Sequence, residues 1–351
     1  MTTPSTSTTT IIEGALRSQL TALAAGETLS DAAMAEALDH IFDGVVSDIE
    51  IAGFLMALRA RGEHPTEIAA AARVMRARAA PVETGLDVVD TCGTGGDGAN
   101  TVNISTAAAI IAAAAGAAVA KHGNRAMSSK SGSSDVLAAL GVNLDADPQQ
   151  IAKCVQTAGV GFMFAPRHHG AAARVAPVRK ALGVRTLFNL LGPLTNPAGA
   201  QRQVIGVFDP TFLEPLAEAL SALGSTRAWI VHGGDGLDEL TVTGPSFVAA
   251  LDKGAVTRFE VTPEDAGLAR HPIESLRGGD PAENAERMKE VLAGRQGAYR
   301  DVALLNAAAA LVVADKAASL RDGAQLAASA IDDGRAAETL KQLVAVSNAP
   351  A

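Results

Sequence analysis

Residues 87–106 read DVVDTCGTGGDGANTVNIST, and the architecture of the chain can be worked out from this stretch. A short apolar run at 87–90 is followed by a glycine-rich loop and then by the start of an alanine-rich segment. A strand, a loop and a helix in this order form the repeating unit of a parallel α/β sheet. Ligands of such sheets bind outside the carboxyl ends of the strands, so we expect the chemistry in this loop and its equivalents.

The loop Gly93–Gly98 matches the G-x-G-x-x-G pattern of dinucleotide-binding proteins. That interpretation requires an acidic residue about 20 positions further on, where it binds the ribose hydroxyl. No Asp or Glu occurs between Gly98 and Asp135, so the dinucleotide interpretation fails. A P-loop is excluded as well, because no Gly-Lys-Ser/Thr ends the loop.

Phosphate binding is the interpretation that remains for this loop. Consecutive glycines let backbone N–H groups approach an anion, and Asn103–Thr106 (NIST) begins the following helix, whose N-terminal N–H groups attract phosphate. A tight turn with ordinary helix caps would also explain the pattern, but the density of glycine and small hydroxyl residues favours a phosphate site. Cys92, beside the loop, is interpreted as a small packed residue and not as a nucleophile.

The rest of the chain divides into a helical part and an α/β part. Residues 11–78 contain almost nothing that favours strands. Within them, Ser47–Glu50 has the form of a capping box, which predicts a helix over 48–61 that ends at Gly62. The apolar run of this helix covers most of its sides, so we expect the whole run to be buried.

Further β-favouring runs alternate with helical segments at 117–120, 161–164, 203–208 and 228–232. We expect an α/β fold with a mainly parallel central sheet. The expected domains are a disordered tail over 1–10, a small all-helical domain over 11–82 joined by about 177–199, and an α/β domain over 83–176 and 200–345. Segment 177–199 is expected to be a helix followed by a turn at 192–197.

Composition excludes several classes of function. The chain has 351 residues, enough for about two domains, and its 29 Lys and Arg against 38 Asp and Glu give a net charge of −9. This charge disfavours nucleic acid as the main partner. Cys92 and Cys154 form no Cys-x-x-Cys pair, so we expect no disulfide framework and a cytoplasmic location. The most apolar stretch, 107–120, is shorter than the roughly 20 residues that span a bilayer, and we expect no membrane role.

Two more loops carry charged residues after predicted strands. Lys121–Ser133 (KHGNRAMSSKSGS) concentrates cations among small hydroxyl residues, which favours an anion pocket over a solvated charged loop. Gly233–Glu239 (GGDGLDE) places two carboxylates next to each other. Alone this is an ordinary acidic turn, but beside two phosphate-type loops it favours Mg²⁺, which binds through few carboxylates together with water and phosphate oxygens.

His168, His169 and Arg179 lie in a fourth segment. The paired histidines have no third ligand at a spacing typical of zinc sites, so we rank zinc low. The planar guanidinium of Arg179 could bind a carboxylate through two hydrogen bonds, although a helix-surface charge is the more common explanation of a single arginine.

Taken together, these motifs closely resemble the anthranilate phosphoribosyltransferase family in order, spacing and identity from about Ser30 to Thr243. The matching motifs are DTCGTGGD at 90–97, NIST at 103–106, KHGNR at 121–125, SGSSDVL at 131–137, VRK at 178–180 and GPLTNP at 192–197. The resemblance implies a small helical domain plus a larger α/β domain, a homodimer and Mg²⁺. It also implies the tryptophan-pathway reaction of phosphoribosyl pyrophosphate with anthranilate, which gives N-(5-phosphoribosyl)anthranilate and pyrophosphate.

The resemblance assigns roles motif by motif. Phosphoribosyl pyrophosphate is expected to contact Gly93, Gly96, Asp97, Thr101, Asn103, Ile104, Ser105, Thr106, Lys121, His122, Gly123, Asn124, Arg125, Ala126, Met127, Ser128, Ser129 and Ser133. Anthranilate is expected to contact Gly93, Asn124 and Arg179, and two Mg²⁺ ions are expected at Ser105, Asp238 and Glu239. No acid or base is assigned, because an aromatic amine is already unprotonated near neutral pH.

One segment departs from the family pattern, and two alternatives stay open. The family has His-Pro-Ala-Met where this chain has His169-Gly170-Ala171-Ala172, a difference that concerns the acceptor and leaves the phosphate loops unchanged. A pyrimidine nucleoside phosphorylase shares the architecture but has a longer chain and a Gly-His-Thr-Gly-Gly-Thr motif that is missing here. The other alternative is a superfamily member that binds nucleic acid or uses a different acceptor. Arg179, Asn124, Asp238 and Glu239, together with the net charge of −9, argue against a protein that binds nucleic acid.

Overall fold

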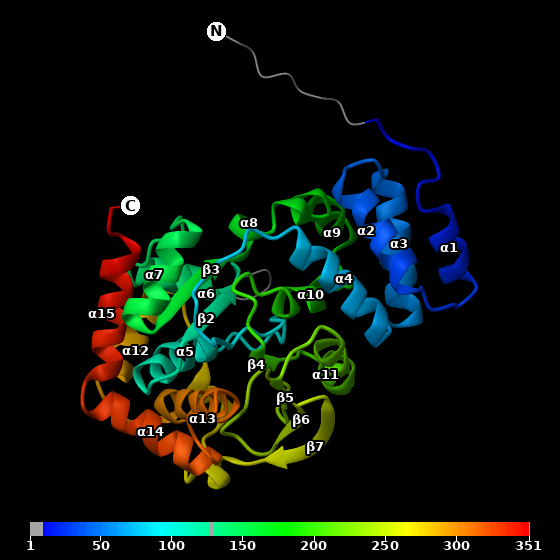
Figure 1. The fold of residues 1–351 in the computed structure, drawn as a ribbon. Coiled ribbons are helices and arrows are strands. Elements are labelled where there is room, and N and C mark those ends of the chain that lie inside the picture. Colours follow the sequence, from blue (N-terminus) through cyan, green and yellow to red (C-terminus); the bar gives the residue numbers. More distant parts are fainter. Residues whose placement is uncertain (1–9, 126–129, 351) are drawn as a thin grey trace. The chain divides into compact units, whose positions relative to one another are not determined.

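The structure, a computed structural model, describes residues 10–125 and 130–350. The chain forms two compact units (Figure 1). The helical unit comprises the chain up to Ala79 together with His169–Leu191, and the α/β unit comprises Ala80–His168 and Gly192–Ala351. The chain therefore enters the α/β unit, returns to the helical unit for one short stretch, and then completes the α/β unit.

The helical unit begins with four successive helices. They are α1 (Arg17–Ala24), α2 (Asp31–Phe42), α3 (Asp48–Arg61) and α4 (Pro65–Ala77), and the returning stretch adds a 3-10 turn (Gly170–Arg174), α9 (Ala176–Leu182) and the start of α10 (Phe188–Leu194). The predicted capping box is confirmed, because Ser47 Oγ accepts the N–H of Glu50 at 3.3 Å and the Glu50 carboxylate accepts the N–H of Ser47. The predicted end of α3 at Gly62, with φ of 93°, is confirmed as well.

Two expectations about these helices are wrong in part. Helix α3 is not buried along its whole apolar run, because Ile49 is 85% exposed and Met56 is 37% exposed while Phe54 and Leu58 fill the core. Ile49 and Met56 are two helical turns apart and so lie on one side of α3. The predicted turn at 192–197 begins later than expected, since its first three residues still belong to α10.

The α/β unit is built around one seven-stranded sheet in the order β3-β2-β1-β4-β5-β6-β7 (Figure 1). The strands are β1 (Val89–Asp90), β2 (Val119–Gly123), β3 (Val160–Phe164), β4 (Arg202–Gly206), β5 (Arg227–Gly233), β6 (Ser246–Asp252) and β7 (Ala255–Val261). Strands β1 to β5 pair in parallel, whereas β5–β6 and β6–β7 pair antiparallel. The expected α/β fold with a mainly parallel sheet is confirmed, and the loops after β1, β2 and β5 leave the sheet at the same edge.

The hairpin formed by β6 and β7 was not predicted. Its turn is made by Lys253 and Gly254, whose φ angles of 48° and 88° are both positive. Two central residues with positive φ are typical of the tight turns that match the twist of a hairpin. Two β-favouring runs around a Lys-Gly pair could have revealed it, but the Lys residue does not belong to the usual turn residues.

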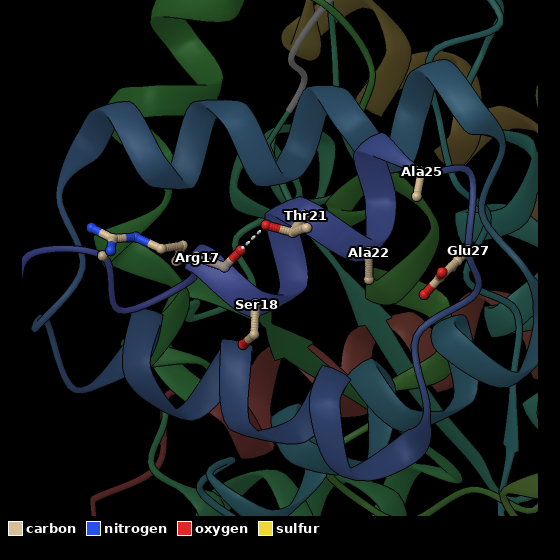
Figure 2. A pocket seen from close by; sticks show the side chains of 7 residues that line it. Arg17, Ser18, Thr21, Ala22, Ala25 and Glu27 are labelled. Atoms are coloured by element: carbon tan, nitrogen blue, oxygen red, sulfur yellow. Dashed lines mark hydrogen bonds between the residues drawn. The ribbon is translucent and has the colours of Figure 1, made fainter.

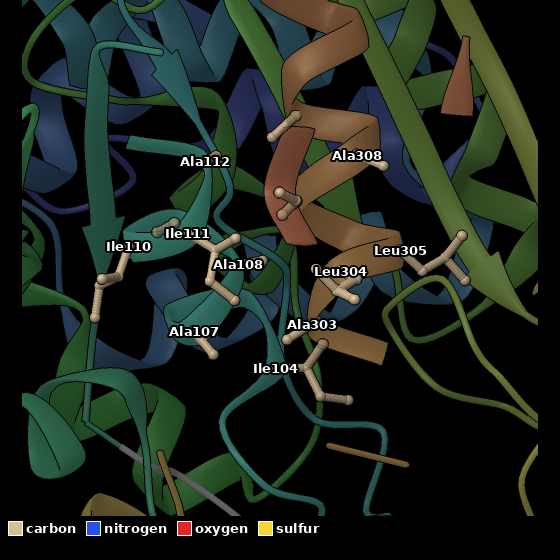
Figure 3. Close-up of a cluster of buried hydrophobic side chains, with 14 of the residues drawn as sticks. Ile104, Ala107, Ala108, Ile110, Ile111, Ala112, Ala303, Leu304, Leu305 and Ala308 are labelled. Atoms are coloured by element: carbon tan, nitrogen blue, oxygen red, sulfur yellow. The ribbon is translucent and has the colours of Figure 1, made fainter. Parts of the chain in front are cut away.

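Helices pack on this sheet and enclose its core. They are α5 (Ile104–Ala114), α6 (Ser133–Ala139), α7 (Pro148–Ala158), α8 (Ala165–His168), α11 (Leu213–Ala222), α12 (Pro281–Leu292), α13 (Ala298–Val313), α14 (Leu320–Asp332) and α15 (Arg335–Ser347), with 3-10 turns at Pro210–Phe212, Pro263–Ala266 and Ile273–Leu276. Figure 3 shows α5 beside α13, with side chains such as Ala108 and Ala303 between them. Small side chains permit this close packing. Because α5 is buried in the core, its N-terminus is held in a fixed position next to the glycine loop.

Candidate active site

The glycine-rich loop follows β1 and is held against the neighbouring strand β4. Thr94 donates its N–H to the carbonyl of Gly206 at 2.8 Å, and Thr94 Oγ1 accepts the N–H of Phe208 at 3.1 Å. Gly95 and Gly96 have φ angles of 66° and 84°, a conformation that residues with side chains rarely adopt. The path of the loop therefore requires these glycines.

Two acidic side chains accept hydrogen bonds from main-chain N–H groups at this edge of the sheet. Gly95 donates its N–H to Asp238 Oδ2 at 2.7 Å, and Ser105, in the first turn of α5, donates its N–H to Glu239 Oε1 at 3.3 Å. The main chain of Asp238 is so close to β4 that a Cβ on Gly206 would stand 1.5 Å from the Asp238 carbonyl oxygen. The structure thus brings together the loop after β1, the start of α5 and the loop after β5.

These carboxyl groups hold their protons more tightly than carboxyl groups in water do. Loss of water raises the pKa of Asp238 to about 7, and the negative charge of Asp97 adds to the rise. Loss of water, with repulsion by Asp238 next, raises the pKa of Glu239 to about 8, and Lys121 opposes this rise without cancelling it. Negative charge that is incompletely compensated is what a bound divalent cation relieves.

The residues at this point fit a magnesium ion. Asp238 and Glu239 offer carboxylate oxygens, Asp97 is within hydrogen-bonding reach of Asp238, and Ser105 lies against Glu239. In the part of the chain that the structure describes, no group of three or more His, Cys, Asp or Glu side chains could hold a metal ion by itself. Mg²⁺ commonly binds one or two carboxylates and completes its shell with water and substrate phosphate oxygens, so this incomplete donor set suits Mg²⁺.

Asn103 connects three segments around the N-terminus of α5. Its Nδ2 donates to the Ser131 carbonyl at 3.1 Å, its Oδ1 accepts from Asn284 Nδ2 at 3.0 Å, and its carbonyl accepts from Tyr299 Oη at 3.2 Å. Asn103 was expected to contact the substrate, and its side chain also joins the two loops expected to bind phosphate. Asn284 and Tyr299 were not predicted, because no motif in the sequence marks these two distant residues.

Lys121 and His122 belong to strand β2 and not to the loop that follows it. The expectation that a loop begins at Lys121 is wrong, because β2 continues through Gly123. Lys121 is 3% exposed and donates its Nζ to the Thr91 carbonyl at 2.8 Å. Its charge therefore lies inside the unit and acts on the buried carboxylates, instead of extending into solvent.

The loop after β2 is closely fitted to the start of α6. A Cβ on Gly123 would stand 2.4 Å from Ser133 Oγ, which itself donates to the Asn124 carbonyl at 3.3 Å. The guanidinium of Arg125 lies 5.7 Å from the centre of the Phe164 ring. The expected substrate residues Ala126, Met127, Ser128 and Ser129 lie outside the described residues.

Three further residues expected to bind the substrate are held by the fold itself. Ile104 and Thr106 are each 1% exposed. The Ile104 N–H donates to the Val102 carbonyl at 2.8 Å, so its side chain serves the core and its N–H is engaged. Thr101 forms an isolated antiparallel bridge with Arg277, a second segment that the sequence did not reveal.

A buried carboxylate lies beneath the two loops. Asp90 ends β1 and accepts the N–H of His122 at 3.1 Å and Asn196 Nδ2 at 2.7 Å. Loss of water raises the pKa of Asp90 to about 6, against the opposing charge of Lys121. The side chain of His122 contacts the Gly192 carbonyl through Nδ1 at 3.0 Å. Asp90 and Asn196 were seen only as parts of motifs, without a role.

Arg179 lies in α9 of the helical unit. Its Nη2 donates to Asn189 Oδ1 at 3.3 Å, and its guanidinium carbon lies 5.7 Å from the centre of the Phe188 ring. Asn189 Oδ1 also accepts the N–H of Thr186 at 3.0 Å. Burial lowers the pKa of Arg179 from its ordinary value. These contacts hold the planar guanidinium against the start of α10.

The two cysteines are free and buried. Burial raises the pKa of the Cys154 thiol to about 11 and raises that of Cys92 as well, so neither has the character of a reactive thiolate. The interpretation of Cys92 as a packed residue is confirmed. Among the helices of the described ranges, none has both the length and the apolar character that a bilayer crossing needs.

Two family models match the chain. Residues 85–337 match the α/β domain of a glycosyl transferase family, and residues 17–79 match the helical bundle domain of a glycosyl transferase family. Together the matched ranges cover nearly the whole chain.

Individual proteins match over almost the same length. The anthranilate phosphoribosyltransferase of Methylocella silvestris is 55% identical over 334 residues, 95% of this chain and 96% of the relative. That of Parvibaculum lavamentivorans is 56% identical over 326 residues, 93% of this chain and 96% of the relative. The crystal structure of the Thermus thermophilus enzyme has a TM-score of 0.89 at 46% identity, covering 94% of this chain and 99% of that one. The Saccharomyces cerevisiae enzyme in complex with phosphoribosyl pyrophosphate (PRPP) and Mg has a TM-score of 0.87 at 28% identity, covering 96% and 98%.

Proposed function

The chain belongs to the anthranilate phosphoribosyltransferase family, and we propose that it catalyses this family's reaction. In that reaction the phosphoribosyl group of PRPP is transferred to anthranilate, giving N-(5-phosphoribosyl)anthranilate and pyrophosphate in tryptophan biosynthesis. The observation that carries the proposal is the meeting of Gly95 with Asp238 and of Ser105 with Glu239 at one edge of the sheet. N–H donors for phosphate and carboxylates for a divalent cation are thereby placed side by side.

We propose that PRPP binds to the loops after β1 and β2 and to the start of α5. The residues in this role are Gly93, Gly96, Asp97, Thr101, Asn103, Ile104, Ser105, Thr106, Lys121, His122, Gly123, Asn124, Arg125 and Ser133, together with 126–129. Support comes from the contact of Asn103 with Ser131, which joins the two loops, and from the N-cap position of α5, where the side chain of Asn103 accepts no N–H of the helix. The side chains of Ile104 and Thr106 are buried, and the Ile104 N–H already donates to the Val102 carbonyl, so contact of Ile104 with PRPP would require this hydrogen bond to be exchanged.

We propose that two Mg²⁺ ions are bound together with the pyrophosphate group. Ser105, Asp238 and Glu239 would hold them, and the raised pKa values of both carboxyl groups support this assignment. When bound, the ions supply positive charge to the pyrophosphate oxygens.

The transfer itself breaks the bond between the anomeric carbon of ribose and a pyrophosphate oxygen. The transition state is expected to resemble an oxocarbenium ion, because the ring oxygen shares the developing positive charge while pyrophosphate takes up the bonding electrons. N–H groups of the glycine loop and the positive charge of Lys121 favour this departure electrostatically. The amine of anthranilate is unprotonated near neutral pH, so we assign no catalytic base.

The acceptor is held by contacts with its carboxylate and its amine in this proposal. Arg179 is the proposed partner of the anthranilate carboxylate, and Gly93 and Asn124 are further proposed contacts. Asn189 and Phe188 support the assignment of Arg179, because they hold its guanidinium in one orientation before a ligand arrives. A pre-oriented guanidinium loses less conformational freedom on binding a planar carboxylate.

We propose that the protein is a homodimer that associates through its helical unit. Ile49 and Met56 form an exposed apolar stripe on α3, and Ile12, whose N–H donates to the Val45 carbonyl shortly before α3, is 51% exposed. An open hollow beside α1 carries Arg17 and Thr21 on its wall (Figure 2), and the hollow that adjoins it is lined in part by Ile49. Exposed apolar side chains beside a hollowed surface are typical of subunit contacts.

The dimer can be tested by light scattering after size-exclusion chromatography. Ile49→Glu is expected to give monomers at micromolar concentration, whereas Leu326→Glu, a matched change at a 41% exposed leucine of α14, is expected to leave the mass unchanged. A monomeric wild-type protein would contradict the proposal.

We propose a cytoplasmic location for the reaction. The two buried free cysteines support it, since reducing compartments keep thiols unpaired. Fractionation of cells with an antibody against the chain would test it.

The reaction is tested by following anthranilate fluorescence. Protein, anthranilate, PRPP and Mg²⁺ are mixed, and released pyrophosphate is measured in parallel, with a chelator as the control. Chelator-sensitive loss of anthranilate matched by pyrophosphate is the expected result. Binding of the donor without consumption of anthranilate would point to a different acceptor.

A further inference from the structure

Asp90 is a fully buried carboxylate at the end of β1, directly before the glycine loop. Strand β2, which leads into the second phosphate loop, is its neighbour in the sheet. Burying a carboxylate costs free energy unless strong hydrogen bonds and nearby charge compensate for the lost water. None of the roles proposed above uses Asp90, so the reason for a charged residue at this place has to be sought in its contacts.

Both carboxylate oxygens of Asp90 are used to join separate segments. Oδ1 accepts the N–H of His122 near the end of β2 at 3.1 Å, and Oδ2 accepts Asn196 Nδ2 at 2.7 Å. The same Asn196 Nδ2 donates to the Ala120 carbonyl at 2.8 Å, while Asn196 Oδ1 accepts the N–H of Ala198. The pair therefore ties β1, the end of β2 and the segment after α10 together.

Lys121 extends this arrangement toward the metal carboxylates. Its ammonium donates to the Thr91 carbonyl, next to Asp90, and acts electrostatically on Asp90 and on Glu239 alike. The buried ammonium of Lys121 thus partly compensates the charge of two carboxylates: Asp90, at the end of β1, and Glu239, a proposed magnesium ligand. A neutral residue at position 90 would leave Lys121 with a weaker counter-charge on the side away from the substrate.

We propose that Asp90, acting with Asn196, is a positioning residue for PRPP. It holds the last residues of β2 against β1, and so fixes the distance between the glycine loop and the loop after β2. The pyrophosphate group has to bind both loops at once, so this distance determines the affinity for the donor. The inference rests on the proposed function and adds a residue that does not itself touch the substrate.

The test separates positioning from ordinary stability. Asp90→Asn keeps the shape of the side chain but sets an NH₂ group against the NH₂ group of Asn196 if the contact to His122 is kept. We expect at least about a tenfold rise in the KM for PRPP, the size of effect that about 1.4 kcal/mol represents. The KM for anthranilate is expected to change less than about twofold. The midpoint of thermal unfolding is recorded for every variant.

A matched control is offered by Gln203. It is fully buried, lies opposite Asp90 in the register of β4, and donates its Nε2 to the Pro193 carbonyl at 2.7 Å. It therefore holds the end of α10, three residues before Asn196, from β4, a strand that is not a neighbour of β2 in the sheet. Gln203→Leu is expected to lower thermal stability and to leave the KM for PRPP unchanged. An equal rise in this KM for Gln203→Leu and Asp90→Asn would overturn the proposal.

The reciprocal exchange provides a rescue. Asp90→Asn combined with Asn196→Asp restores a donor and an acceptor across the 2.7 Å contact but sets a carboxylate oxygen against the Ala120 carbonyl, so it should recover only part of the affinity lost in Asp90→Asn. If Asp90→Asn does not fold, Asn196→Ser removes one of the two joining contacts and is measured in the same way. If none of the folded variants of Asp90 and Asn196 changes the affinity for PRPP, the positioning role is refuted.

Calorimetric titration with inorganic pyrophosphate and Mg²⁺ accompanies the kinetics. This readout needs no turnover, so it tests the positioning role even if wild-type protein does not consume anthranilate. A wild-type protein that binds pyrophosphate but transfers nothing would contradict the proposed function alone. Equal pyrophosphate affinity in wild type and Asp90→Asn would contradict the positioning role alone.

Discussion

The N–H group of Gly95 donates a 2.7 Å hydrogen bond to the carboxylate of Asp238, which lies 143 positions further along the chain. Glu239 makes the equivalent contact with the N–H of Ser105 at the start of α5. Both N–H groups belong to segments proposed to bind phosphate, so the chain's own carboxylates occupy donors that a phosphate needs. An anion that approaches these segments without a cation meets negative charge at the place where it has to bind.

This relationship predicts how pyrophosphate binds without metal. At pH 8.5, above the pKa of about 7 that burial gives Asp238, Asp238→Asn is expected to bind inorganic pyrophosphate at least about tenfold more tightly than wild type in the presence of a chelator, because one repelling charge is removed. Added Mg²⁺ is expected to improve the affinity of wild type far more than that of the variant. Isothermal titration calorimetry measures both affinities.

Asp235→Asn is the control for this measurement. Asp235 lies in the same loop, but its carboxylate accepts from the hydroxyl groups of Thr241 and Thr243. Its replacement removes one negative charge without touching the N–H groups of the phosphate loops. Metal-free affinities that are equal in wild type and Asp238→Asn, or raised equally by Asp235→Asn, would contradict the prediction.

The same carboxyl groups predict how the stability of the metal-free protein depends on pH. Their pKa values in the folded state, about 7 for Asp238 and about 8 for Glu239, lie above the ordinary carboxyl range. From that range up to about pH 8 the folded state binds more protons than the unfolded state, so the free energy of unfolding falls as the pH rises. We expect the melting temperature in chelator to be several degrees lower at pH 8.5 than at pH 6.

The variant Asp238→Asn/Glu239→Gln isolates this effect from other titrating groups. It cannot lose protons at the two positions, so its melting temperature should change less between the same two pH values. Excess Mg²⁺ should raise the melting temperature of wild type more at pH 8.5 than at pH 6. A wild-type melting temperature that rises with pH, in parallel with the variant's, would show that the two carboxyl groups titrate normally.

Arg179 is predicted to act on the acceptor alone. Arg179→Ala should raise the KM for anthranilate by about tenfold or more and leave the KM for PRPP nearly unchanged, because the bidentate partner of the carboxylate is lost. Lys180→Ala, at the exposed neighbouring position of α9, is the control and should change neither constant. A selective change in the KM for PRPP would show that the assignment of Arg179 is wrong.

Gly206 is predicted to be needed for the position of the acidic loop. A Cβ there would overlap the carbonyl oxygen of Asp238, so Gly206→Ala has to displace the main chain of this residue. We expect a loss of about 1–3 kcal/mol in the free energy of unfolding, typical of overpacking, and a higher Mg²⁺ concentration at half-maximal activity. Gly244→Ala, where nothing lies within 4 Å, should change neither quantity. Denaturant unfolding and a Mg²⁺ titration of the activity measure these two quantities. A Gly206→Ala variant with unchanged stability and an unchanged Mg²⁺ requirement would contradict the prediction.

Features coded by neighbouring residues could be predicted from the sequence. The capping box at Ser47 and the end of α3 at Gly62 each depend on a few adjacent residues, and both are confirmed. The parallel sheet follows from the alternation of strands and helices, which the order of runs in the chain displays directly. The β6–β7 hairpin was not predicted because its turn uses Lys253 with a positive φ, a conformation that the residue type does not indicate.

Features that depend on distant contacts could not be predicted. The bond between Gly95 and Asp238 and the burial of Asp90 arise only when strands far apart in the chain become neighbours. The exposure of Ile49 likewise depends on which side of α3 meets other helices, and its apolar neighbours gave no sign of that side. The sequence motifs indicated which segments form the candidate active site, but not which side chains hold its loops in place.

The packing of α5 against α13 has a consequence for how amide hydrogens of the α/β unit exchange with solvent. The first turn of α5 belongs to the proposed phosphate site, while its alanine residues are enclosed in the centre of the α/β unit. Such a helix cannot open by itself, so its amide hydrogens should exchange with solvent only when the whole unit opens. Any anion bound at its first turn would then slow hydrogen exchange throughout the unit, including at α13, and not merely around the ligand.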